Sequence, residues 1–82
     1  MSEKTEVPLS RMPAGQSAII VRIHGGHGLM NRLGSLGIRP GRRITKVSSM
    51  LMRGPVTIRV GNSQVAIGFG IANKILVELE QA

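Results

Sequence analysis

Residues 56–67 read VTIRVGNSQVAI, and this stretch indicates a fold built from short β-strands. The first five residues alternate apolar and polar side chains, which is the pattern of a strand with one buried face. Gly61-Asn62 then supplies a two-residue turn, because glycine and asparagine accept the positive φ angles that tight hairpins need. Residues 64–67 return as the partner strand, so we expect a β-hairpin here.

Further short strands are expected on both sides of this hairpin, at residues 17–23, 43–49 and 75–79. The first is rich in β-branched residues, and the last alternates apolar residues with glutamates. The strand at 43–49 has an imperfect pattern, because Ile44 and Val47 would fall on opposite faces. A β-bulge, or burial of both faces, would explain that pattern.

A short helix is expected between the first of these strands and the second. Leu29, Leu33 and Leu36 recur at helical spacing and are expected to pack on the core. Gly37 follows as a C-terminal cap, because glycine enters the left-handed region without a Cβ clash. The next four residues, Arg39-Pro40-Gly41-Arg42, have the composition of a type II turn.

These elements predict a mainly β fold, a small five-stranded barrel with one short helix after the first strand. Closing the sheet is the economical arrangement, since open edges invite aggregation. Residues 1–82 are expected to form one domain, in which residues 1–7 would be a flexible N-terminus. Residues 68–74 are rich in glycine, and the sequence does not decide whether they form one short helical turn.

Composition narrows the classes of function. The chain has no cysteine, which excludes disulfides, thiol catalysis and thiolate zinc sites. Phe69 is the only aromatic residue, and this counts against binding of nucleic acid by base stacking. The N-terminus lacks the pattern of a signal peptide, and no apolar stretch is long enough to cross a bilayer. We therefore expect a cytoplasmic location.

Charge is distributed unevenly along the chain. The net charge is +7, and the four acids, Glu3, Glu6, Glu78 and Glu80, all lie near the ends. Such a one-signed surface favours an anionic partner, which could be nucleic acid, an anionic membrane face or an acidic protein. The alternative is a basic surface that serves only solubility.

Catalytic, metal and cofactor sites are not expected. The only bases in the middle of the chain are His24 and His27, and the sequence has no aspartate to orient either of them. Two histidines make half a metal site at best, and iron(II) would require carboxylate ligands as well. The glycines at 25–28 are not followed by the Gly-Lys-Ser/Thr of a phosphate-binding loop.

Three consecutive large apolar residues follow the strand at 43–49, where polar loop residues are the norm. Flexible methionines suit adaptable partner surfaces, and the basic strand beside them would ring the apolar residues with charge. The expected partner-binding residues are Met50, Leu51, Met52, Arg53 and Arg43. The alternative is that two of the three apolar residues plug the barrel. The next candidate surface is the helix face around Asn31, Arg32 and Ser35.

The stretch Leu36-Gly37-Ile38-Arg39-Pro40-Gly41, between a leucine-rich helix and a strand, resembles the ferrous iron transport protein A (FeoA) family. The resemblance extends over nearly the whole chain, from about Pro8 to Glu80. Its other parts are Pro8-Leu9-Ser10, Pro13-Ala14-Gly15-Gln16, Arg22 to Arg32, Gly54-Pro55 and Ala72 to Val77. One departure is the loop at 50–53, which is commonly small and glycine-rich in the family, so a contact made there would be local to this subgroup.

The resemblance implies an SH3-like barrel and a small cytoplasmic accessory protein of bacterial ferrous iron transport, without enzymatic activity. The implied partner is the cytoplasmic part of the transporter, a membrane G-protein, whose assembly or activity would be modulated. Membrane contact would come through that partner only. One arginine could also act as an arginine finger on the GTPase of that partner, and the chemically possible residues are Arg39, Arg42, Arg43 and Arg53. The alternative function is a basic, SH3-like nucleic-acid-binding module.

Overall fold

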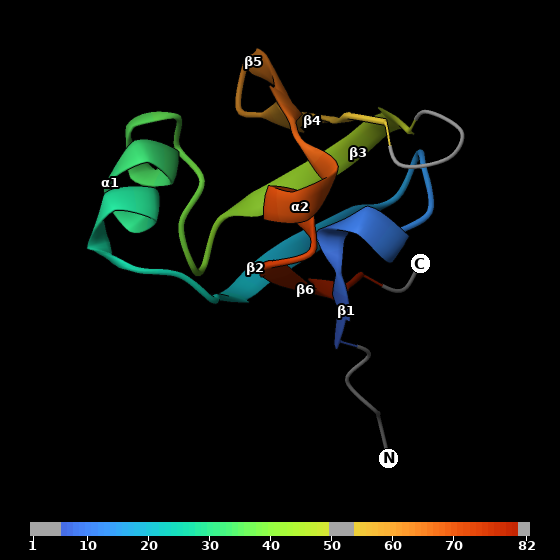
Figure 1. The fold of residues 1–82 in the computed structure, drawn as a ribbon. Coiled ribbons are helices and arrows are strands. Elements are labelled where there is room, and N and C mark those ends of the chain that lie inside the picture. The colour runs from blue at the N-terminus through green and yellow to red at the C-terminus, as the bar shows by residue number, and fades with distance from the viewer. Residues whose placement is uncertain (1–5, 50–53, 81–82) are drawn as a thin grey trace.

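The computed structural model describes residues 6–49 and 54–80. Its strands and α-helices are labelled in Figure 1, and η1, which has no label there, is a single turn of 3-10 helix directly after β1. In chain order they are β1 (Glu6–Pro8), η1 (Leu9–Arg11), β2 (Ser17–Ile23), α1 (His27–Ser35), β3 (Arg43–Ser49), β4 (Val56–Val60), β5 (Ser63–Ile67), α2 (Phe69–Ala72) and β6 (Ile75–Leu79).

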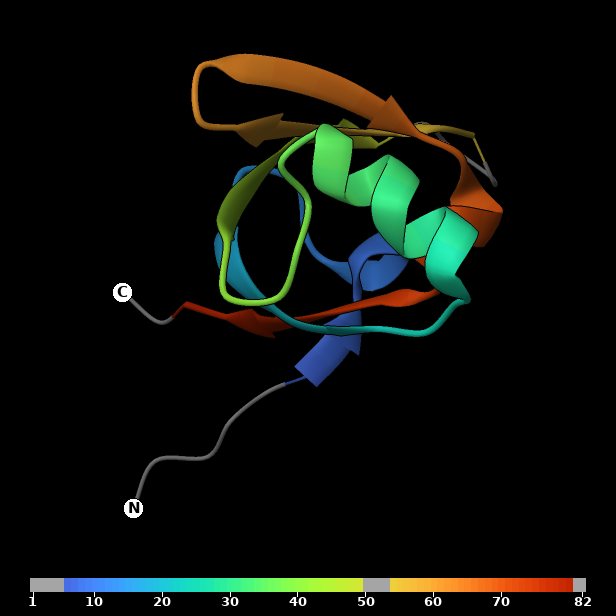
Figure 2. The same cartoon turned by 90° about the vertical axis from the view of Figure 1, so that its left-hand side faces the viewer.

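The strands form one antiparallel sheet in the order β1-β6-β2-β3-β4-β5. Figure 2 shows this sheet curled around the interior, with the β4–β5 hairpin on one side, β2 and β6 on the other, and α1 lying between them. The prediction of five strands is wrong by one, because β1 also pairs with β6. Glu6 and Val7, which were expected to belong to a flexible N-terminus, lie in this strand. Three residues ending in proline carry too little alternation to be recognised as a strand.

The predicted hairpin is confirmed. Burial along β4 alternates as expected, and Val60 pairs with Ser63 across the turn. Gly61 takes a φ of 61°, which is the left-handed conformation that such a turn requires. Apolar residues from the hairpin join those of the other elements in one core. Its members are Leu9, Met12, Ala18, Ile20, Leu33, Ile38, Ile44, Val56, Ile58, Val60, Ile67, Ala72, Ile75 and Val77.

The irregular pattern of β3 comes from a β-bulge. The register between β3 and β4 shifts between Lys46 and Ser48, so the chain gains one residue on the β3 side. Ile44 and Lys46 are each 1% exposed, whereas Val47 is 38% exposed. The bulge that the sequence suggested is therefore present, and a lysine occupies the core position beside Ile44.

Candidate functional site

The C-terminal end of α1 is a Schellman motif. The amide of Ile38 donates to the carbonyl of Leu33 at 2.9 Å, and the amide of Gly37 donates to Gly34 at 3.0 Å. Gly37 has a φ of 87°, as the prediction of a glycine cap requires. The motif turns the chain back on itself, so that Ile38 and Leu33 are both buried in the core.

Leu36 lies on the outside of this turn. The prediction that it packs on the core is wrong, because the side chain is 44% exposed. The reason is the chain reversal at Gly37, which brings Ile38 over Leu33 and leaves Leu36 facing away. Among the described residues, Leu36 and Val47 are the large apolar side chains that are exposed to this degree. Leu36 is therefore an apolar anchor that folding leaves available for a partner.

Exposed arginines surround the end of the helix. Arg32 is four residues before Leu36, which is the C-cap of α1, and both residues are exposed. Arg39 donates from Nη2 to the carbonyl of Gly34 at 2.7 Å, and this cation at the negative end of the helix dipole is favourable. Arg42 is the last residue of the type II turn, and its Nη2 lies 3.0 Å from the position that a Cβ would take at Gly61.

The segment that carries these residues lies beside the β4–β5 turn. A Cβ at Gly37 would come 3.2 Å from Cγ1 of Val60, and a Cβ at the neighbouring Gly61 would come 3.0 Å from Nη2 of Arg42. We call the exposed residues Arg32, Leu36, Arg39 and Arg42 of this segment the α1–β3 surface.

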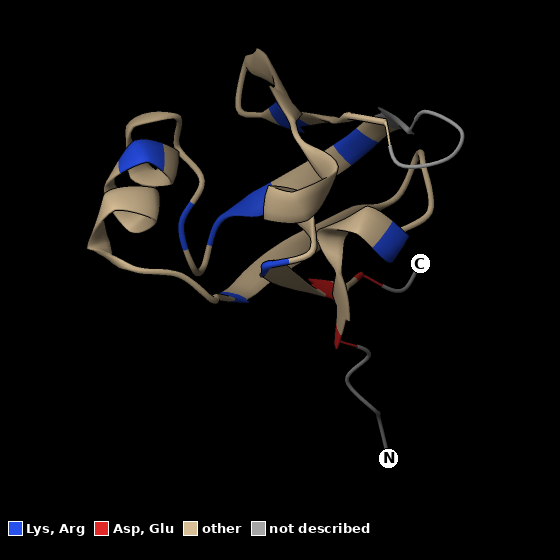
Figure 3. Ribbon diagram, viewed as in Figure 1, with Lys and Arg blue, Asp and Glu red and all other residues tan. Residues whose placement is uncertain are grey.

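Acidic residues lie on a different part of the sheet. Figure 3 shows Lys and Arg on α1, on the loop after it and on β3 and β4, and also on η1, on β2 and just before β6, whereas the acidic residues lie on β1, on β6 and beyond it. In residues 6–49 and 54–80, the ion pairs join Arg22 to Glu6 and Arg43 to Glu80. The α1–β3 surface is therefore basic, and its charge is not neutralised by those ion pairs.

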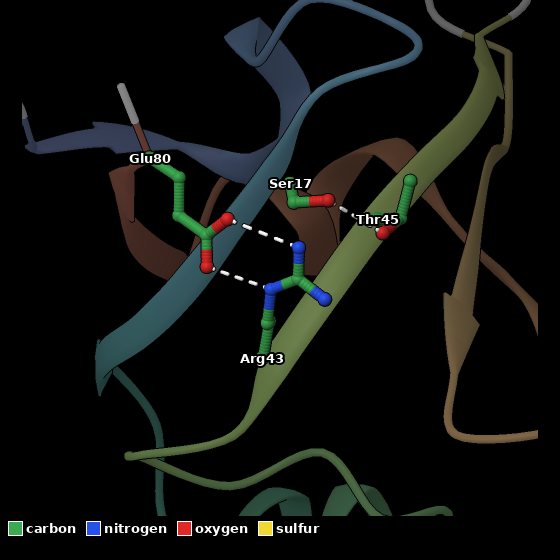
Figure 4. A network of polar contacts seen from close by, with 4 residues as sticks. All are labelled: Ser17, Arg43, Thr45 and Glu80. Carbon is green, nitrogen blue, oxygen red and sulfur yellow. Dashed lines mark hydrogen bonds and ion pairs between the residues drawn. The ribbon is translucent and has the colours of Figure 1, made fainter. Parts of the chain in front are cut away.

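Arg43, one of the predicted partner-binding residues, is engaged within the chain. Its Nε and Nη2 donate to the two carboxylate oxygens of Glu80 at 2.7 and 3.1 Å (Figure 4). The same close-up shows the hydrogen bond of 2.8 Å between the hydroxyl groups of Ser17 and Thr45. The hydrogen bond and the charge of Glu80 raise the pKa of Arg43, and those of Arg43 lower the pKa of Glu80. The other four predicted residues, Met50 to Arg53, lie outside the described part of the chain.

Sequence reasoning missed the burial of Lys46. Its ammonium group donates to the carbonyl oxygens of Leu9, Ser10 and Met12, so each of its three protons has an acceptor. Burial lowers the pKa of Lys46 below 10.5, while the three carbonyl oxygens favour the charged form. The sequence contained a sign of this burial, because Lys46 is two residues after Ile44 and side chains two apart in a strand lie on the same face. This contact joins η1 and Met12, the residue after it, to β3 within the core.

His24 and His27 are both exposed, and His27 begins α1. Within the described ranges, no group of three or more His, Cys, Asp or Glu residues is placed to hold a metal ion. The same part of the chain contains no helix that is long and apolar enough to span a membrane.

The FeoA domain family matches residues 7–79 of this sequence. The chain belongs to the FeoA domain family. Among curated proteins, it is similar to the "Putative Fe(2+) transport protein A" of Methanocaldococcus jannaschii. The two are 39% identical over 71 residues, which cover 87% of this chain and 84% of that protein.

Solved FeoA structures have the same fold. The crystal structure of an iron uptake regulatory protein, FeoA, superposes with a TM-score of 0.83 at 41% identity and covers 93% of this chain and 99% of its own. The solution structure of iron(II) transport protein A from Clostridium thermocellum has the same TM-score at 29% identity, covering 89% of this chain and 45% of its own. The FeoA structures are SH3-like, and this confirms the predicted fold class. The sheet of this chain has six strands, whereas five were predicted.

Proposed function

We propose that this FeoA-domain protein is a non-enzymatic accessory of ferrous iron transport that binds the cytoplasmic part of the membrane transporter and modulates its assembly or activity. Membership of the family supports a role in ferrous iron transport. The printed names of similar proteins, an Fe(2+) transport protein A and an iron uptake regulatory protein, support the same role. The proposal places the protein in the cytoplasm, next to that partner.

The observation that carries the binding proposal is the exposed Leu36 within the basic α1–β3 surface. Protein interfaces commonly have an apolar anchor at the centre and charged residues at the rim. Leu36 supplies the anchor at 44% exposure, and Arg32, Arg39 and Arg42 supply the rim. A complementary partner would present an apolar pocket bordered by carboxylates.

The test is a binding titration between the full chain and the purified cytoplasmic domain of its cognate transporter. Leu36→Ala is expected to weaken binding by about tenfold or more, because truncating a buried anchor at a hot spot costs about 2 kcal/mol. Val47→Ala is the matched control, since Val47 is the other exposed large apolar residue among the described residues and lies on β3, away from Leu36 in the sequence. Equal effects of the two variants, or none from either, would exclude the α1–β3 surface as the binding site.

Modulation is tested separately from binding. GTP turnover by the transporter domain, and assembly of the transporter in membranes, are measured with and without the wild-type chain. If the chain binds but changes neither GTP turnover nor assembly, the proposed binding would stand and the proposed modulation of the transporter would be wrong. Absence of any binding, in detergent-solubilised full-length transporter as well, would contradict the proposal as a whole.

The arginines of the α1–β3 surface also support nucleic-acid binding as a second candidate function. Phosphate contacts through arginine release counterions, so such binding is sequence-blind and falls steeply with salt. Binding to random duplex DNA that is lost between low and physiological salt would assign these arginines only a general affinity for anions. Strong, sequence-selective binding at physiological salt would instead favour the nucleic-acid function over transport.

A further inference from the structure

In the part of the chain that the structure describes, one edge of β5 is unpaired. In the order β1-β6-β2-β3-β4-β5 it is the last strand, and within the described residues it pairs with β4 alone. Ser63, Gln64 and Ala66 are exposed. In Figures 1 and 2, β5 runs along the outside of the molecule, on the far side of β4 from the rest of the sheet.

The hairpin register identifies which main-chain groups face outward. Val60 and Ser63 close the two-residue turn, so they form a hydrogen-bonded pair, and such pairs recur at every second residue of an antiparallel ladder. By this alternation, Val65 and Ile67 bond to β4. The amide and carbonyl groups of Gln64 and Ala66 then point to the unpaired side.

This edge lacks the features that usually protect a terminal strand. Proteins block such edges with charged residues, proline, bulges or very short strands. The other end of the sheet is protected in this way, because β1 has only three residues, including Glu6 and Pro8. The sequence of β5, SQVAI, has no charge and no proline, and its pairing with β4 is regular over all five residues. The edge is therefore open to another strand.

Charge indicates the kind of strand that would be added. Arg59 lies directly across from Gln64 on β4, and the guanidinium group of Arg42 lies beside the turn at Gly61. An added strand would run about 10 Å from β4, a distance that an arginine and a glutamate side chain can span together. A second copy of this chain would bring another set of arginines and a further net charge of +7 to the same place. An acidic segment would be attracted instead.

We propose that β5 is a strand-addition site for an extended, acidic segment of a partner protein. Main-chain hydrogen bonds to Gln64 and Ala66 would supply the affinity, and Arg59 would supply the preference for carboxylates. The site is separate from Leu36, and it does not require the partner to be the iron transporter. Its failure would leave the proposed accessory function unaffected.

The experiment uses the full chain and a synthetic eight-residue peptide that alternates glutamate with valine. Amide hydrogen exchange is followed by NMR, because a new strand protects the individual amides to which it bonds. Saturation with the peptide is expected to slow exchange of the Gln64 and Ala66 amides by about tenfold or more. A peptide with lysine in place of glutamate is expected to have no such effect.

Two variants separate the main-chain contribution from the charge contribution. Ala66→Pro removes an outward-facing amide and is compatible with an edge strand, so it should weaken peptide binding about tenfold while the β4 amides stay protected. Arg59→Gln should also weaken binding, whereas Lys74→Gln, with the same change in charge, should not. Because Arg59→Gln leaves the main chain unaltered, it tests the site even where the proline variant fails to fold.

Three results would overturn the proposal. One is exchange protection that appears on α1 and not on β5. Another is wild-type affinity in a folded Ala66→Pro variant. The last is protection of Gln64 and Ala66 that develops without peptide as the protein concentration rises, which would identify a second copy of the chain as the occupant.

Discussion

The ammonium group of Lys46 donates a hydrogen bond of 2.5 Å to the main-chain carbonyl of Met12. Two longer bonds reach Leu9 at 3.2 Å and Ser10 at 3.3 Å. A lysine on the core face of β3 thus provides the acceptors at the end of η1 with donors. Without Lys46, these carbonyl groups would lack hydrogen-bond donors, because the core excludes the water that could otherwise supply them.

Lys46→Met is expected to lower the free energy of unfolding by about 1–3 kcal/mol, because it leaves buried acceptors without donors. Thermal unfolding followed by circular dichroism measures the effect, and about 4–8 °C of melting temperature is expected per kcal/mol. Lys74→Met, at an exposed lysine, is the control and should change little. An unchanged or higher melting temperature for Lys46→Met would show that the carbonyl groups find other donors.

The pair formed by Arg43 and Glu80 predicts a pH dependence. Because the folded-state pKa of Glu80 is below 4.5, the pair stabilises the fold above that pH, and the contribution is lost as the pH falls through the folded-state pKa. Both groups are exposed, so the effect on stability is small. NMR titration of the Glu80 carboxyl group should show the low pKa in the wild type and a normal value in Arg43→Gln. Arg22→Gln, which breaks the other ion pair, should leave this titration as it is.

Leu33 and Leu36 are expected to respond differently to truncation, although both are leucines near the end of α1. Leu33→Ala should cost about 2–5 kcal/mol, since it leaves a cavity in the core. Leu36→Ala should change stability by no more than about 0.5 kcal/mol, since the side chain is exposed. Urea denaturation of the two variants measures both values. A large loss from Leu36→Ala would mean that this side chain packs against the protein and is not free to anchor a partner.

Two glycines of the same helix end should have opposite effects when changed to alanine. Gly37→Ala is expected to cost about 1–2 kcal/mol, because its φ of 87° is strained for alanine and its Cβ would crowd Val60. Gly34→Ala meets no neighbour within 4 Å and should stabilise α1 by about 0.5–1 kcal/mol. Melting temperatures of the two variants give the comparison, and a shift of the same sign in both would contradict it.

Residues 50–53 lie outside the described residues and remain a predicted partner-binding segment. Leu51→Ala combined with Met52→Ala is expected to weaken binding to the transporter domain by about tenfold, with little change in stability. Pull-down and thermal unfolding of the double variant test both parts. A loss of many degrees would identify the loop as a plug of the core. Unchanged binding by a folded variant would leave the helix face around Asn31, Arg32 and Ser35, and the α1–β3 surface beside it, as the next candidates.

Features that depend on local conformation were predicted well from the sequence. The β4–β5 hairpin, the glycine cap of α1 and the turn at Arg39–Arg42 all depend on the φ angles of a few neighbouring residues. Gly41 has a φ of 93°, and the amide of Arg42 donates to Arg39 at 3.1 Å, as a type II turn requires. Such preferences act within four residues and can be read without knowing the fold.

Features that depend on distant partners were not predictable in this way. Arg43 was taken as available, yet its partner Glu80 lies 37 residues away and meets it only in the folded sheet. Leu36 fits the helical period, but the chain reversal at Gly37 gives its core position to Ile38. The burial of Lys46 depends on carbonyl groups from η1. These outcomes follow from tertiary contacts, which override the local pattern.

The position of β6 between β1 and β2 has a consequence for synthesis of the chain on the ribosome. Val7 pairs with Val77, and Ile20 pairs with the same residue from the other side. Strands β1 and β2 therefore lack β6, the strand that lies between them, until residues 75–79 have been made. Pairing over so long a separation is intrinsically slow, and it leaves the edge of β2 that pairs with β6 open to aggregation in the meantime. We expect nascent chains that stall before residue 75 to need chaperone protection, although only a few residues are still missing from the fold.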